Sequence, residues 1–124
     1  SEAEIYAKAG LQFIEPEMRE GISEIDLAKE NKVPELIRTT DLKGCLHNHS
    51  TYSDGANTIR EMAEQCMKEG LQYFSICDHS KSAFYAGGLS EESVVRQHQE
   101  IDRLNAELHP FRIFKGIEKS IQNY

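Results

Sequence analysis

Two histidines separated by a single residue are the most prominent residues of this sequence that could carry out chemistry. His47 and His49 belong to the segment CLHNHSTYSDG, residues 45–55, which also contains Asp54. On a strand, side chains at i and i+2 point to the same face, so both imidazoles would face one volume. Neutral imidazole is the commonest metal ligand, and carboxylate oxygen accompanies it in Zn, Mn and Fe sites. Because Gly55 permits a sharp turn, Asp54 can fold back toward the same volume.

Further potential ligands follow two later apolar runs. Asp78 and His79 come directly after the first run, and Glu118 comes after the second. The carboxyl ends of parallel strands meet at one edge of a sheet, where α/β proteins place their active sites. This convergence predicts a metal site more strongly than the histidine pair alone, since two surface histidines on a strand are common. We expect Asp78 to lie behind the ligands and to orient an imidazole.

Other reactive residues have simpler interpretations. Lys81 follows the turn at His79 and could contact an anion of the substrate, although exposed loop lysines are usually solvated. His98 lies beside the apolar face of a predicted helix and His109 at a helix end, so neither is expected to bind metal. Cys45 and Cys77 lie in apolar strands, where small buried hydrophobic residues are the better interpretation.

Alternating strands and helices would position these residues. Apolar runs bounded by glycine, proline and polar residues predict strands, and apolar residues at helical spacing predict helices. We predict strands over residues 42–49, 71–77 and 111–117 and helices over 58–70 and 90–108. Thr58 and Glu61 have the spacing of a capping box, Ser90 is the N-cap of the second helix, and Pro110 prevents its continuation. The pattern indicates βαβ units with a parallel sheet, an α/β fold.

The first forty residues follow a different pattern. One helix ends at Gly10, a short helix begins at the cap Ser23, and Pro34 disfavours helix in the segment around it. We therefore predict a helical connector over residues 1–40 and the α/β part over 41–124.

Composition narrows the class of protein. The net charge of −7 does not suit a stand-alone nucleic-acid-binding protein, which would show a basic patch. No apolar run approaches the roughly 18 residues of a membrane span, so no membrane partner is expected. The three cysteines contain no CxxC pair and argue for a reducing compartment. A cytoplasmic protein is the expectation.

The order and the strand context of these motifs resemble the PHP (polymerase and histidinol phosphatase) family over residues 41–118. In that family an HxH pair and SDG follow one strand, DH follows the next, and GxE follows the third. The matching residues are His47, His49, Ser53, Asp54, Gly55, Asp78, His79, Gly116 and Glu118. The upstream segment AGLQFIEPEMREG is similar to the junction between the polymerase and PHP parts of bacterial family X DNA polymerases. The sequence departs from the family at Cys45, where an aspartate is frequent, and it lacks the family's later histidine and aspartate motifs.

The resemblance implies a fold, a metal centre and an activity. The fold would be a distorted, TIM-like (βα)7 barrel, of which this chain would supply about three βα units. The ligands would be His47, His49, Asp54, His79 and Glu118, with Glu118 as the bridging carboxylate of two or three Zn or Mn ions. The activity would be phosphoester hydrolysis, and in family X polymerases a 3'–5' exonuclease that processes DNA ends in repair. DNA 3' ends, the rest of the PHP domain and a polymerase domain would then be partners.

Three alternatives stay open. One is a small-molecule phosphatase of the histidinol phosphatase type, acting on a small phosphate ester. Another is a different amidohydrolase-like metal enzyme, which the SDG and DH motifs disfavour. The last is a metal-bound structural module without activity. Three strands cannot close a barrel, so we also expect an inactive fragment with an open third strand. That fragment would dimerise, swap elements with another chain, or cover the open edge with its N-terminal helices.

Overall fold

The computed structural model describes residues 1–119 and divides the chain into two units, Ser1–Arg38 and Thr39–Tyr124. The division lies close to residue 40, where the sequence pattern changes. Each unit has a hydrophobic core of its own. Within residues 1–119, no helix combines the length and the apolar character needed to cross a membrane.

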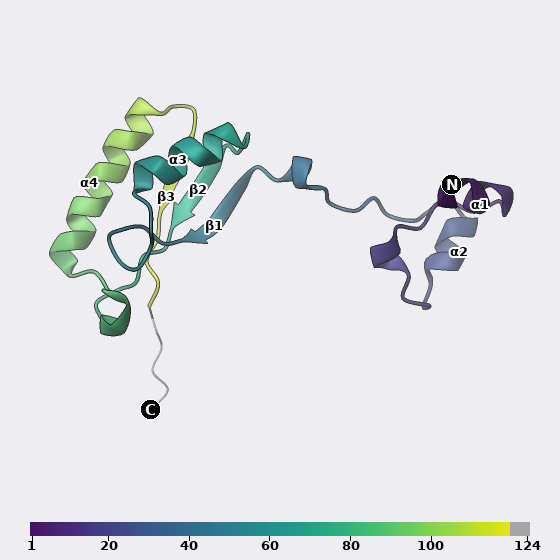
Figure 1. The fold of residues 1–124 in the computed structure, drawn as a ribbon, viewed down its shortest axis with the longest axis horizontal. Coiled ribbons are helices and arrows are strands. Elements are labelled where there is room, and N and C mark those ends of the chain that lie inside the picture. The colour runs from purple at the N-terminus through teal and green to yellow at the C-terminus, as the bar shows by residue number, and fades with distance from the viewer. Residues whose placement is uncertain (120–124) are drawn as a thin grey trace. The chain divides into compact units, whose positions relative to one another are not determined.

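Two short helices, α1 (Glu2–Lys8) and α2 (Glu24–Lys29), form the first unit around a small core (Figure 1). Gly10 follows α1 in the left-handed conformation, as predicted for a helix end. Ser23 occupies the N-cap position of α2 but makes no side-chain cap bond, which differs from the prediction. The carboxylate of Glu24 instead accepts three hydrogen bonds from the backbone N–H groups of residues 21–23. These donors precede the helix, whereas a serine cap would accept from an N–H group within its first turn.

The second unit is an α/β fold with a parallel three-stranded sheet in the order β1-β2-β3. This confirms the predicted fold class. The capping box of Thr58 and Glu61 and the N-cap Ser90 also form as predicted. The strands are β1 (Gly44–Asn48), β2 (Tyr73–Ile76) and β3 (Arg112–Lys115), and the helices are α3 (Ile59–Lys68) and α4 (Glu91–Glu107). This unit also has the short 3-10 helices η2 (Thr39–Asp41) and η3 (Phe84–Ala86), and the first unit has η1 (Pro16–Met18).

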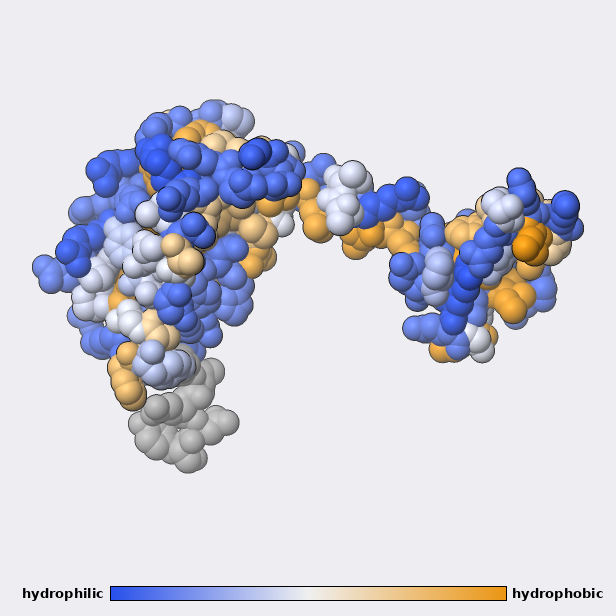
Figure 2. Space-filling view, in the orientation of Figure 1, coloured by the Kyte–Doolittle hydropathy of each residue, from blue (hydrophilic) through white to orange (hydrophobic). Residues whose placement is uncertain are grey.

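One face of the sheet carries the core of the second unit. Phe74 and Ile76 are two residues apart on β2 and point to the same face, where both are fully buried. Ile59 of α3 and Ile101 of α4 belong to the same cluster, so both helices cover this face (Figure 1). Hydrophilic residues cover much of the outward side of these helices (Figure 2). Helices on a single face with strands in sequential order are how a (βα) barrel begins, whereas doubly wound sheets have helices on both faces.

The outer strands β1 and β3 are the edges of the sheet within the described part of the chain. Each edge leaves backbone groups on one side without a strand partner in this sheet. Pairing of the third strand with another chain stays a prediction.

A buried aspartate joins three segments of the second unit at the carboxyl end of β2. Asp78 is fully buried and accepts hydrogen bonds from the backbone N–H of Ser50 at 2.7 Å and from the Ser50 hydroxyl at 2.5 Å. It also accepts bonds from the Ser53 hydroxyl at 2.5 Å and from Nε2 of Gln97 on α4 at 2.6 Å. Its bonds therefore hold the loop after β1 in place. The sequence led us to expect a bond from Asp78 to an imidazole, but none of these four bonds involves one.

We predict that Asp78→Asn lowers the free energy of unfolding of the chain by roughly 3 kcal/mol, because an amide cannot accept from all four donors and leaves some of them buried and unpaired. Urea unfolding followed by circular dichroism, with a chelator present, measures this. Asp102→Asn is the matched control, since Asp102 is 65% exposed and its ion pair with Lys115 is worth less than about 1 kcal/mol. Equal losses in the two variants would contradict the prediction.

Candidate metal centre

The strand that carries the histidine pair is irregular. The register between β1 and β2 shifts between Cys45 and Asn48, and His47 has a φ of 66°, in the left-handed region. Simple alternation along a strand is therefore not what brings the pair together. A bulge of this kind redirects a side chain and is common beside active sites. The rings of His47 and His49 nevertheless lie with their centroids 5.3 Å apart.

One oxygen of Glu118 lies among three imidazoles. Its Oε2 is 3.2 Å from Nε2 of His47, 3.4 Å from Nε2 of His49 and 3.4 Å from Nδ1 of His79. An isolated parallel bridge between His79 and Glu118 continues the pairing of β2 with β3 and fixes this position. The bonds from Ser80 N–H to the Glu118 carbonyl and from Glu118 N–H to the Asp78 carbonyl complete it.

Asp54 reaches the other side of two of these rings. Its Oδ1 is 3.3 Å from Nδ1 of His49, and its Oδ2 is 3.3 Å from Nε2 of His79. Gly55 makes the loop possible, but by close approach: a Cβ there would overlap the carbonyl oxygen of His49. The Gly55 N–H donates to the carbonyl of Ser50, at 2.9 Å. All five predicted ligands are thus brought to one place.

These residues form two overlapping sets of potential ligands, each with its donor atoms within 4.8 Å of one another. The sets are His47, His49 and Glu118, and His49, Asp54 and His79. Nδ1 of His49 and Nδ1 of His79 are buried and make no hydrogen bond among the described residues. A neutral imidazole donates from one nitrogen only, so its second nitrogen would turn a lone pair toward a carboxylate oxygen. The lone pair of the nitrogen and the negative carboxylate oxygen repel each other. A cation between these two atoms removes the repulsion, and the donor set therefore fits a metal ion.

The other predicted residues lie outside these sets within the described part of the chain. Lys81 forms an ion pair with Glu91 at 2.6 Å, and this hydrogen bond raises the pKa of the exposed lysine. Cys45 is half-buried against the core, with its sulfur 3.9 Å from that of Cys66. Burial, together with Cys45, raises the pKa of Cys66 to about 11, so this thiol stays protonated near neutral pH.

Sequence reasoning missed the residues that hold the loop. Gln97 is 1% exposed and lies at helical spacing between Val94 and Ile101, so a polar residue within an apolar stripe was the available signal. Tyr52 donates a hydrogen bond to Glu100 at 2.8 Å and joins the loop to α4. Burial, reinforced by that carboxylate, raises the pKa of Tyr52 to about 12.

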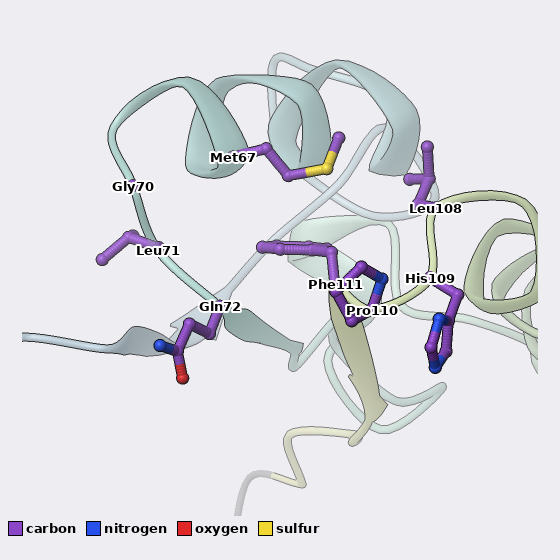
Figure 3. Close-up of a pocket in the computed structure, with 8 residues that line it drawn as sticks. All are labelled: Met67, Gly70, Leu71, Gln72, Leu108, His109, Pro110 and Phe111. Atoms are coloured by element: carbon purple, nitrogen blue, oxygen red, sulfur yellow. The ribbon is translucent and has the colours of Figure 1, made fainter.

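An apolar cavity of about 560 Å³ lies at the opposite edge of the sheet (Figure 3). Its lining includes Gln72 and Phe111, which directly precede β2 and β3. The other lining residues are Met67, Gly70, Leu71, Leu108, His109 and Pro110. With a single imidazole and no carboxylate in its lining, this cavity is not a second metal site.

Comparisons with known proteins identify the family. Residues 46–123 match the PHP domain. Over 121 residues, 98% of this chain, the sequence is 50% identical to "DNA polymerase/3'-5' exonuclease PolX" of Bacillus subtilis (strain 168). The chain spans 21% of the length of that relative. With the parallel sheet and the ordered motifs at its carboxyl edge, these matches show that this chain belongs to the PHP domain family.

Proposed function

We propose that this chain is the metal-binding part of a phosphoesterase that removes nucleotides from DNA 3' ends, within a protein related to the family X polymerases. The observation that carries the proposal is the pair of ligand sets that share His49 and converge on Asp54 and Glu118. The printed name of the relative, a DNA polymerase and 3'–5' exonuclease, supports DNA as the substrate. A cytoplasmic location suits an enzyme that acts on bacterial DNA.

The donor types suit hydrolysis of a phosphoester, whose negative charge repels nucleophiles. Bound metal ions would lower the pKa of a water molecule toward neutrality and would offset the charge of the phosphate oxygens. Glu118 offers one oxygen to three imidazoles, which suits a bridging carboxylate. His47, at 65% exposed, lies at the solvent side of the cluster, whereas His79 is only 13% exposed. Asp78 keeps the loop that carries Asp54 in place.

Zn or Mn are the ions we propose, because nitrogen and carboxylate donors without thiolate suit both. The two ligand sets would offer places for up to two ions. Because a neutral imidazole has one free lone pair, His49 would serve one of these ions at a time. A third ion would need donors from residues outside the two sets. The relative that matches this chain is longer, and its additional length would have to supply such donors. A small phosphate ester is the second candidate substrate, because the cluster by itself recognises the phosphoester group and not what is attached to it.

We predict that His49→Ala weakens binding of Zn or Mn by more than the roughly 10- to 100-fold typical of residues behind metal ligands, because both sets lose a donor. Isothermal titration of the metal-stripped chain measures this. His109→Ala is the matched control, an exposed histidine outside the cluster, and should bind like wild type. Equal affinity and stoichiometry in His49→Ala and wild type would refute the proposed ligands.

We predict that Glu118→Gln lowers the rate of nucleotide release from a 3' end by roughly 100-fold or more, because several kcal/mol of stabilisation depend on the metal centre. The assay uses the full-length protein that contains this chain, a 5'-labelled oligonucleotide and added Mn. Glu107→Gln, an exposed glutamate at the end of α4, is the control and should keep the wild-type rate. Normal turnover by Glu118→Gln would rule out the proposed centre, and turnover of a small phosphate ester alone would favour the second candidate.

A further inference from the structure

Two exposed aromatic side chains lie beside the proposed metal centre. Phe84 is 82% exposed and Tyr85 is 72% exposed, both on η3 in the connection between β2 and α4 (Figure 1). The ring centroid of Tyr85 is 6.4 Å from that of His79, and the Phe84 ring is 5.9 Å from Tyr85 in an edge-to-face arrangement. The His79 ring in turn lies 4.4 Å from that of His49. The aromatic pair thus continues directly from the ligand side chains.

The loop that carries these rings is firmly anchored. A parallel bridge joins Ser80 and Leu89, and the Leu89 N–H donates to the carbonyl of His79 at 2.7 Å. Ala83 is fully buried, and a Cβ at Gly88 would overlap the carbonyl oxygen of Ser80. Ala83, Ala86 and Leu89 of the loop therefore face inward, whereas its two aromatic residues face solvent. Their exposure follows from how the loop is folded and does not come from loose packing.

Exposed aromatic rings next to a phosphoester site suit a particular kind of substrate. Single apolar residues on a surface are ordinary, but here two adjacent rings adjoin a ligand histidine. A nucleotide carries its base one sugar away from its phosphate, so a base can reach these rings while the phosphate lies at the cluster. Because the chain has a net charge of −7, it gains little from general attraction to phosphates. Stacking on aromatic rings supplies affinity for single strands that does not depend on such attraction.

We propose that Phe84 and Tyr85 form a stacking platform for a nucleobase next to the phosphoester held at the metal centre. The substrate class is then a single-stranded nucleic-acid end and not a small phosphate ester. This inference rests on the proposed function for its phosphate site, but the stacking itself does not require turnover.

The first test measures kinetics in the full-length protein that contains this chain. Two single-stranded oligonucleotides differ only at the 3'-terminal residue, which either carries a base or is abasic. With Phe84→Ala and Tyr85→Ala combined, we expect KM for the base-bearing end to rise roughly 5- to 100-fold, with kcat little changed. The abasic end should be cleaved with an unchanged KM. Val95→Ala, which removes a 55% exposed apolar side chain from α4, should change neither value.

The second test measures binding without turnover. Fluorescence anisotropy with the same oligonucleotides in a chelator should show a comparable loss of affinity for the base-bearing strand only. The exchanged variant with Phe84→Tyr and Tyr85→Phe keeps two rings and should restore binding. Thermal unfolding of every variant checks that the fold is intact.

The outcomes separate the two proposals. Base-dependent binding that needs the rings, without nucleotide release by the wild type, would overturn the exonuclease and leave the platform standing. Nucleotide release with the same KM in wild type and double variant would overturn the platform alone. An equal rise in KM for a small aromatic phosphate ester would show a general ring site and would overturn the assignment to nucleic acid.

Discussion

The buried carboxylate of Asp78 is the constraint on which the proposed centre depends. A fully buried charge is stable only when hydrogen bonds replace its hydration, and Asp78 obtains four from Ser50, Ser53 and Gln97. These bonds join the loop after β1, the end of β2 and helix α4. The loop that carries Asp54 therefore has a defined position relative to His79, which directly follows Asp78 in the sequence.

The singly wound sheet explains why donors distant in sequence converge. Parallel strands in the order β1-β2-β3 bring their carboxyl ends to one edge, so His49, His79 and Glu118 meet although each follows a different strand. Both helices cover one face of the sheet. On the other face, Phe114 is 46% exposed. The same winding therefore positions the ligands and leaves edges and a face available to further elements of a barrel.

The cluster of potential ligands is charged, whereas the aromatic pair in the adjacent loop is not. Two carboxylates and three imidazoles crowd together, and two buried ring nitrogens have no hydrogen bond among the described residues, so the cluster suits cations. The adjacent loop presents Phe84 and Tyr85, which are uncharged. In the arrangement that we propose, the substrate is held by its phosphate at the ions and by a base on the aromatic pair, which compensates for the acidic character of the chain as a whole.

The sequence by itself determined the elements and the types of donor. Capping residues such as Thr58 and Ser90 act within one helical turn, and strand ends follow from apolar runs, so both could be predicted locally. The bulge at His47 could not, because it depends on how β1 pairs with β2. Only the tertiary structure decided that Asp78 binds Ser50, 28 residues away, and Gln97, 19 residues away, instead of an imidazole. A buried carboxylate takes whichever donors the packing places around it, and that placement is set by contacts between segments far apart in the chain.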